Sequence, residues 1–144
     1  MYNLDMEIFG CLFDILGEIA RKRYVAGEKY YAKHGLNHTE GRILRLIQEA
    51  QEEISQDELG LQITIDRTNV GRALAKLETA GLIVRCPDPS DKRAKVVKIT
   101  TQGQALVRRI AKDRSMMLEE FFGNLTKDEA AAAVSLLKKV VESQ

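Results

Sequence analysis

Three kinds of residue are scarce in this sequence of 144 residues. It has no tryptophan, two prolines and two cysteines. So few prolines favour a mostly helical chain, because proline removes a backbone N–H donor and breaks helix interiors. The cysteines, Cys11 and Cys86, lie far apart and form no Cys-x-x-Cys pair. The sequence therefore predicts a reduced, cytoplasmic chain rather than a small domain held together by disulfides.

Long apolar runs are also missing. No stretch approaches the ~18 consecutive apolar residues that a membrane span requires, and acids interrupt the apolar residues near the N-terminus. A basic region followed by an apolar core, the mark of a secretory signal, is not found there either. We therefore expect neither a membrane span nor a secretory leader.

The motifs of common enzyme classes are absent from the sequence. It has no Gly-rich phosphate loop, no nucleophile turn of the Gly-x-Ser-x-Gly type and no Ser-His-Asp order. The two histidines, His34 and His38, have a spacing that suits a metal on a helix. Gly35 stands between them, however, and no further ligand lies close in sequence. We expect ordinary surface histidines, no catalytic residue, no metal and no cofactor.

Charge is distributed unevenly, although the formal net charge is only +1. Residues 1–20 carry four acids and no lysine or arginine, whereas residues 64–98 carry eight lysines and arginines against four acids. A basic segment in a nearly neutral chain is the electrostatic footprint expected of a protein that binds nucleic acid.

Hydrophobic periodicity predicts helices at the start of the chain. Apolar residues recur at three- and four-residue spacings from Leu4 to about Lys33. Gly35 is a natural residue to follow the end of this helix. Next comes a second amphipathic helix, with Asn37 or Thr39 as its N-cap.

The C-terminal part of the chain is also predicted to be helical. A long helix is expected from a capping box of Thr101 and Gln104 to about Phe122, and a final helix follows a capping box of Thr126 and Glu129. Together the terminal helices carry more apolar surface than one small core needs. This surplus favours a dimer; the alternative is that these helices pack on their own domain.

The centre of the chain has the pattern of two short helices. Ser55 and Glu58 form a capping box that opens the first. Residues 64–66 open the second, which has an apolar stripe on one face and ends at Gly81. Two short helices separated by a few residues predict a helix-turn-helix.

The spacing of the apolar residues changes after Gly81, from a helical pattern to one typical of strands. Residues 82–86 and 95–100 are predicted to be strands, around a turn cluster at residues 87–91. A hairpin directly after a helix-turn-helix is a wing. The predicted fold is therefore mainly α with a small β-hairpin wing, a winged helix-turn-helix with long N- and C-terminal dimerisation helices.

The second helix of the helix-turn-helix carries the side chains expected to contact a DNA duplex. Opposite its apolar stripe it is predicted to expose Arg67, Thr68, Asn69, Arg72 and Lys76. Arginine bonds guanine, asparagine bonds adenine, and threonine contacts a thymine methyl group or a phosphate. Lys76 lies farther along and is expected to meet phosphate. The alternative is a solvated polar face, which every amphipathic helix has.

The turn of the hairpin carries Asp91, Lys92 and Arg93. We expect the Asp91 carboxylate to hold the Arg93 guanidinium in one orientation, so that the arginine enters the minor groove, where narrow A·T-rich stretches concentrate negative potential. The alternative is a polar hairpin with a surface ion pair that contributes little.

Taken together, these motifs resemble the MarR family (multiple-antibiotic-resistance regulators). The similarity is carried by residues 36–39, 66–78 and 81–85, and by wing residues 88–93 and 97–103. It implies a homodimer, with the helix from residue 66 in the major groove and Arg93 in the minor groove. We therefore expect a sequence-specific transcriptional regulator of double-stranded DNA, a repressor that reads a pseudo-palindromic operator.

The resemblance also implies how the chain is divided. Residues 1–144 form one winged-helix regulator domain, in which residues 36–103 are the DNA-binding lobe and residues 1–33 and 104–144 are dimerisation helices. Ligand pockets in the family commonly lie between the two parts.

Three residues near the end of the first helix suit such a pocket. Arg23, Tyr24 and Tyr31 are the residues expected to hold a small aromatic or anionic effector that modulates DNA affinity. The alternative is a solvated basic face with tyrosines packed at the junction of the lobes.

Two other functions remain open. Some relatives sense peroxide through a cysteine in the first helix, but apolar neighbours and Asp14 disfavour the reactive thiolate of Cys11. A buried, inert cysteine is expected, with redox sensing as the alternative, and Cys86 is expected to be structural. A winged helix used only for protein contact is the other alternative, and the basic residues of the helix and wing argue against it.

Overall fold

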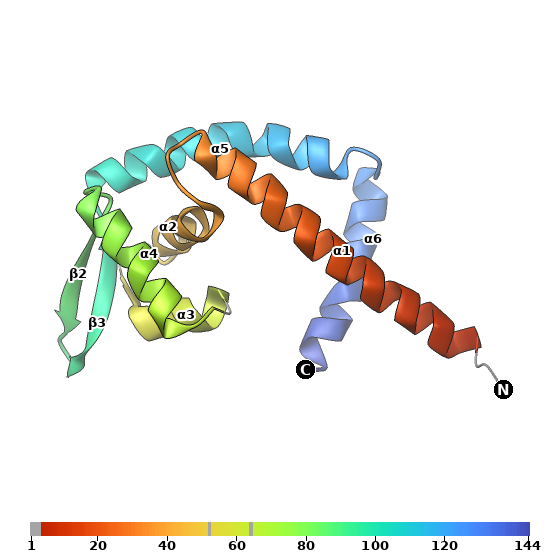
Figure 1. Ribbon diagram of the computed structural model, residues 1–144, viewed down its shortest axis with the longest axis horizontal. Coiled ribbons are helices and arrows are strands. Elements are labelled where there is room, and N and C mark those ends of the chain that lie inside the picture. The colour runs from red at the N-terminus through yellow and green to blue at the C-terminus, as the bar shows by residue number, and fades with distance from the viewer. Residues whose placement is uncertain (1–3, 52, 64) are drawn as a thin grey trace. The chain divides into compact units, whose positions relative to one another are not determined.

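The computed structural model describes residues 4–51, 53–63 and 65–144 of the chain (Figure 1). Residue 64, which the sequence assigns to the opening of a helix, lies outside them. The chain divides into two compact units, Met1–Lys112 and Asp113–Gln144.

Helix α1 (Leu4–Ala32) confirms the long N-terminal helix to within a residue. Gly35 follows its end with a φ of +75°, a left-handed conformation that glycine adopts without a steric penalty. The last turns of α1 are buried through Tyr30 and Tyr31. The Tyr30 hydroxyl donates to the carbonyl of Ile110, which joins α1 to helix α5 (Thr101–Phe122).

Helix α2 (His38–Glu49) begins at a complete capping box. The Asn37 side chain accepts from the Glu40 backbone N–H at 2.8 Å, and the Glu40 carboxylate accepts from the Asn37 N–H at 3.2 Å. Of the two caps predicted for this helix, the structure therefore has Asn37 and not Thr39. These bonds satisfy N–H groups that have no partner within the helix.

Helices α3 (Gln56–Ile63) and α4 (Arg67–Thr79) confirm the helix-turn-helix (Figure 1). The Ser55 hydroxyl accepts from the Glu58 N–H at 3.1 Å, as its capping role requires. Asp66 caps α4, and Gly81 follows its end with a φ of +77°. These caps set the length of α4, because they supply partners for its free backbone groups.

The core of the first unit is built by apolar stripes on α2, α3 and α4. Ile43 and Leu44 of α2, Leu59 of α3, and Leu74 and Leu77 of α4 are almost completely buried. Each such side chain contributes roughly 1.5–3 kcal/mol through burial. Because the stripe of α4 faces this core, its opposite face is left for solvent.

The sheet has three antiparallel strands in the order β1-β3-β2, namely Ile54–Ser55, Asp91–Ile99 and Ile83–Asp88. Strand β1 was not predicted, because two residues are too few to show an alternating pattern. The turn predicted at residues 87–91 is wrong at its edges, since Pro87 pairs with Lys95 and Asp88 with Asp91. Only residues 89–90 form the turn.

One carboxylate explains why the turn is so short. Asp88 accepts hydrogen bonds from the backbone N–H and the hydroxyl of Ser90, at 2.9 and 2.8 Å. These two bonds close the turn and lower the pKa of the Asp88 carboxyl, with the backbone bond contributing most. The hairpin is therefore longer and its tip tighter than the sequence indicated.

Helix α5 begins one residue earlier than its predicted capping box requires, so the prediction of Thr101 as its cap is wrong. Thr100 takes that place: its hydroxyl accepts from the Gly103 N–H at 3.0 Å and donates to the Gly81 carbonyl at 2.7 Å. A β-carbon at Gly103 would lie 2.2 Å from the Leu82 carbonyl oxygen, so only glycine fits there.

The second unit contains the end of α5 and helix α6 (Lys127–Glu142). The predicted capping box is confirmed: the Thr126 side chain accepts from the Glu129 N–H at 3.1 Å, and Glu129 accepts in return at 3.0 Å. Within α6, Val134, Leu136 and Val141 are exposed.

Candidate nucleic-acid interface

Helix α4 presents its polar face to solvent. Arg67, Thr68, Asn69, Arg72 and Lys76 are all exposed, as the sequence predicted. Behind them the apolar stripe of the same helix is buried. The helix is therefore anchored on one side and free on the other, which is the arrangement that a helix entering a groove requires.

The start of α4 is held by a carboxylate. Asp66 accepts from the backbone N–H of Asn69 at 2.9 Å and from the Asn69 side-chain amide at 3.0 Å. One donor of the amide is therefore fixed, and the asparagine has a defined orientation at the exposed end of the helix. Asn69 was predicted to contact bases, but its partner Asp66 could not be recognised from the sequence.

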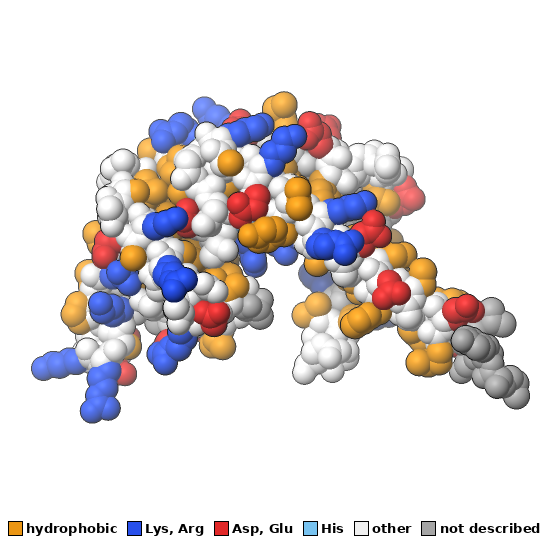
Figure 2. All heavy atoms as spheres, in the orientation of Figure 1, with side chains coloured by type: hydrophobic (Ala, Val, Ile, Leu, Met, Phe, Trp, Pro, Cys, Tyr) orange, Lys and Arg blue, Asp and Glu red, His pale blue; other side chains and the backbone are white. Residues whose placement is uncertain are grey.

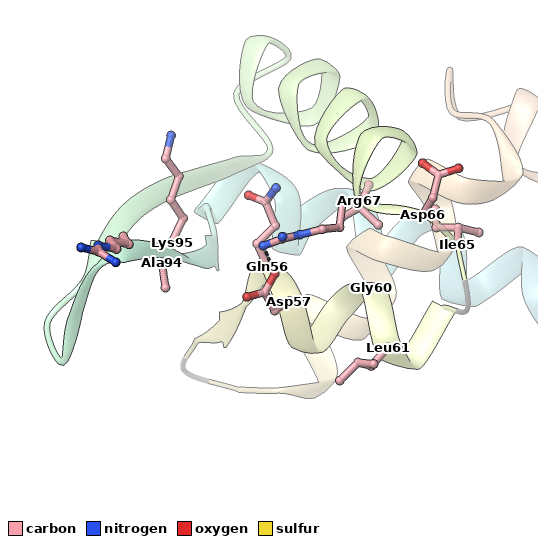
Figure 3. A pocket seen from close by; sticks show the side chains of 11 residues that line it. Gln56, Asp57, Gly60, Leu61, Ile65, Asp66, Arg67, Ala94 and Lys95 are labelled. Carbon is pink, nitrogen blue, oxygen red and sulfur yellow. Dashed lines mark hydrogen bonds and ion pairs between the residues drawn. The ribbon is translucent and has the colours of Figure 1, made fainter.

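A hollow of about 820 Å³ lies between the start of α3, the start of α4 and strand β3 (Figure 3). It brings the Arg67 side chain of α4 and Arg93 of the wing to one surface. The Arg67 guanidinium reaches across to Asp57 of α3, with 3.0 Å between Nη2 and Oδ1. No local pattern in the sequence indicates this pair, because its members are ten residues apart on different helices.

The wing exposes Lys92 and Arg93 beside Asp91 at the start of β3. The predicted contact between the Asp91 carboxylate and the Arg93 guanidinium is wrong. Asp91 Oδ1 accepts instead from the backbone N–H of Arg93, at 3.0 Å. The carboxylate therefore fixes the backbone next to the turn, and the guanidinium extends into solvent.

The base of the wing is attached to the end of α4. The Glu78 carboxylate accepts from both the backbone N–H and the guanidinium of Arg85, each at 3.2 Å. The hydrogen bond from the guanidinium, aided by its charge, lowers the pKa of the Glu78 carboxyl. This two-point contact fixes the direction of β2 relative to α4, and sequence analysis did not find it.

Lysine and arginine side chains gather on this part of the molecule. Figure 2 shows them over α4 and at the tip of the hairpin, and they come from the segment that the sequence marked as basic. The exposed cations of the helix face and of the wing would attract the negative phosphates of a duplex.

The residues assigned to an effector lie at the junction of α1 and α2. The rings of Tyr24 and Tyr31 approach the imidazole of His38, with centroids 5.3 and 6.0 Å away. Arg23 and Tyr24 are exposed, whereas Tyr31 is buried. Arg42 of α2 brings a further positive charge close to His38. The sequence did not point to Arg42, because its place beside α1 depends on how the helices pack.

The expectation of two surface histidines is wrong for His38, which is only 8% exposed. Gly27 makes room for it, since a β-carbon there would lie 2.0 Å from Nδ1. Burial lowers the pKa of His38, and the charges of Arg42 and Arg23 lower it further. Among the described residues, no group of three or more His, Cys, Asp or Glu side chains is arranged to hold a metal.

The expectation of a buried Cys11 is also wrong for the single chain, in which this thiol is exposed. The apolar residues around it, including Phe9, Leu12 and Phe13, are themselves exposed, so they do not cover the sulfur. The sequence indicated the apolar neighbours of Cys11 correctly but did not indicate that these neighbours are exposed in the single chain. Cys86 is half-buried.

The exposed helix α4 and the hairpin fixed to its end define a winged helix-turn-helix. A sequence model described as the MarR family matches residues 36–95. The uncharacterized HTH-type transcriptional regulator YkoM of Bacillus subtilis (strain 168) is 31% identical over 107 residues, which are 74% of this chain and 69% of that protein. This chain belongs to the MarR family of transcriptional regulators.

Two further comparisons extend over nearly the whole chain. The uncharacterized HTH-type transcriptional regulator YdgJ of the same Bacillus strain is 28% identical over 88% of this chain and 77% of its own length. A crystal structure of a mutant MarR from Escherichia coli, complexed with operator DNA, is 29% identical with a TM-score of 0.82. It covers 96% of this chain and 99% of that one. The winged-helix fold predicted from the sequence is thereby confirmed.

In the part of the chain that the structure describes, no helix combines the length and the apolar character that a bilayer span demands.

Proposed function

We propose that the protein is a homodimeric repressor that binds a pseudo-palindromic operator through α4 and the wing. The observation that carries this proposal is that the exposed basic face of α4 and the wing meet at one hollow, which Arg67 and Arg93 both line. In this assignment, Thr68, Asn69 and Arg72 read bases, Arg67 and Lys76 meet the flanks of the site, and the wing, with Asp91, Lys92 and Arg93, occupies the minor groove. A similar MarR structure holds operator DNA, which supports the same role here.

The dimer is inferred from apolar surface that the single chain leaves exposed. On α1, Ile8, Phe9 and Phe13 are each more than half exposed, and Figure 2 shows hydrophobic side chains along this part of the helix. Exposed apolar patches of this kind mark sites of association. We assign residues 1–33 and 104–144 to dimerisation and residues 36–103 to DNA binding, within one regulator domain.

Binding to the DNA upstream of the protein's own reading frame tests this function. We expect a mobility shift and a footprint with two half-sites about 10 base pairs apart, because a two-fold dimer places its recognition helices one turn apart. The logarithm of the affinity should fall with the logarithm of the salt concentration with a slope of about −4 or steeper. A single asymmetric half-site contradicts the dimer geometry. A shift that does not respond to salt contradicts the role of the basic surface and favours a module for protein contact.

An anionic aromatic effector is the second part of the proposal. Arg23 and Tyr24 are exposed at the junction of α1 and α2, and Tyr31 lies buried behind them. Arginine pairs with a carboxylate, while the tyrosine ring packs on an aromatic plane. We therefore propose that a small aromatic acid binds here and lowers DNA affinity.

Calorimetry with salicylate measures this effector directly. The wild-type dimer should give a saturable heat, and Arg23→Ala should weaken binding at least about tenfold, because a hydrogen bond to a charged group contributes about 1.5–3 kcal/mol. Lys29→Ala removes an exposed base from the last turn of the same helix and should leave the affinity unchanged. The absence of a saturable heat would leave the tyrosines and arginine with a packing role only.

Catalysis and a redox switch are not part of the proposed function. The relatives named above are transcriptional regulators, and we propose a cytoplasmic regulator without enzymatic activity. Exposure of Cys11 in the single chain keeps the redox alternative open. Loss of DNA binding on mild peroxide that Cys11→Ser abolishes would favour it.

A further inference from the structure

The exposed face of α4 carries two cations that are already paired with carboxylates before any DNA is bound. Arg67 pairs with Asp57 at 3.0 Å, and Lys76 lies 3.9 Å from Glu40. By contrast, no ion pair involves Arg72, Lys92 or Arg93 among the residues that the structure describes. Asp57 and Glu40 therefore lie beside two particular cations of α4 and not beside every cation of the proposed interface.

The environment of Glu40 is unusual for a carboxylate. Its side chain is only 7% exposed. Oε1 accepts from the Asn37 N–H, whereas Oε2 is buried and has no hydrogen-bond partner. Glu40 also borders a hollow of about 270 Å³ that Asn69, Arg72 and Lys76 line as well. A buried, partly unsatisfied charge is costly, and the Lys76 ammonium is the cation placed to compensate it.

We propose that Asp57 and Glu40 are specificity-determining residues that suppress binding to non-cognate DNA. The proposal rests on the DNA-binding function proposed above. Affinity for random DNA comes almost entirely from cations that neutralise phosphates. A cation that already faces a carboxylate contributes less to this term, because a phosphate that approaches it also approaches the negative partner.

The same pairs do not prevent contact with a cognate site. Arg67 has five N–H donors, and its recorded bond to Asp57 uses Nη2 only. The remaining donors are free to contact a base edge or a chosen phosphate while the pair holds the guanidinium in place. The carboxylates thus lower the affinity for random DNA more than the affinity for the operator.

Fluorescence anisotropy on operator and random duplexes, measured as a function of salt, tests the proposal with Asp57→Asn and Glu40→Gln. Both substitutions keep the shape of the side chain, and glutamine retains an oxygen that can accept in the α2 capping box. Each variant should bind random DNA about fivefold more tightly. The salt slope should steepen by about 0.9 for each cation released, hence by about 1.8 for a dimer. Operator affinity should change less than twofold.

Matched controls separate this effect from a general change in charge. Glu58→Gln removes the charge next to Asp57 on α3. The Glu58 carboxylate accepts from the Gln62 side-chain amide and, among the residues that the structure describes, pairs with no cation of α4. It should leave the ratio of operator to random affinity unchanged. In an Arg67→Met background, Asp57→Asn should no longer raise affinity for random DNA, since no cation remains to be released.

The outcomes distinguish the two proposals. Suppose that the wild-type protein prefers its operator but Asp57→Asn and Glu40→Gln leave the ratio of operator to random affinity unchanged; the acids then do not determine specificity. The same conclusion follows if Glu58→Gln lowers this ratio as much as Asp57→Asn does. If the wild-type protein shows no preference for any duplex, the DNA-binding function itself is wrong and this inference falls with it.

Discussion

Arg93→Ala is expected to lower operator affinity at least about 30-fold. The loss of an arginine that contacts DNA costs about 1–3 kcal/mol, and a dimer carries two wings, so the total is roughly 2–6 kcal/mol. The guanidinium extends freely from the start of β3, where Asp91 fixes the backbone. Its removal should therefore leave the fold intact, and thermal unfolding of the variant should match that of the wild-type protein.

The Arg93 variant differs in kind from variants of α4. Arg93→Ala should weaken binding to most sequences, whereas Arg72→Ala and Asn69→Ala should also relax the base preference at one position of each half-site. Arg109→Ala, which removes an exposed arginine of α5 outside the helix-turn-helix and wing, is the control and should change affinity little. An equal loss on operator and random DNA for all three α4 and wing variants would show that the assigned roles are wrong.

Phe13→Glu is expected to dissociate the dimer and abolish operator binding at concentrations that saturate the wild-type protein. The Phe13 side chain is 78% exposed in the single chain and lies among other exposed apolar residues of α1. Loss of its burial in a dimer costs about 1.5–3 kcal/mol per protomer. Two-fold symmetry doubles this cost, and a buried carboxylate adds to it. The dissociation constant of the dimer should therefore rise roughly 100-fold or more.

Sedimentation analysis and a mobility shift on the same samples measure this effect. Lys29→Glu also places a carboxylate on α1, at an exposed position in its last turn, and should remain dimeric. Circular dichroism checks that the helices persist in both variants. A Phe13→Glu protein that sediments as a dimer and shifts the operator normally would show that this face of α1 is not the interface.

Local signals in the sequence predicted the elements well, because each depends on neighbouring residues. The Thr126–Glu129 capping box and the end of α4 at Gly81 are set by contacts within four residues. The exposed face of α4 followed from its apolar period for the same reason. Errors of a residue or two arose where a neighbour of the same type competed, as Thr100 does with Thr101.

Contacts between elements were beyond the sequence. Nothing local indicates that Arg67 pairs with Asp57, or that Lys76 approaches Glu40. His38 was expected at the surface because its burial depends on the space that Gly27 leaves on another helix. For the same reason the residues proposed to face DNA could be predicted from the sequence, whereas the acids that pair with Arg67 and Lys76 could not.

The joint around Thr100 has a mechanical consequence. Its hydroxyl links Gly81, two residues beyond the end of α4, to the first turn of α5, and Gly103 lies directly against the Leu82 carbonyl at the base of the hairpin. We expect such a corner to transmit rotation, because these bonds and the close contact at Gly103 couple α5 to the base of the hairpin. Strand β3 has nine residues, so the hairpin is a lever arm of roughly 27 Å. A tilt of α5 by about 5° would therefore swing the wing tip by roughly 2 Å, enough to break a hydrogen bond.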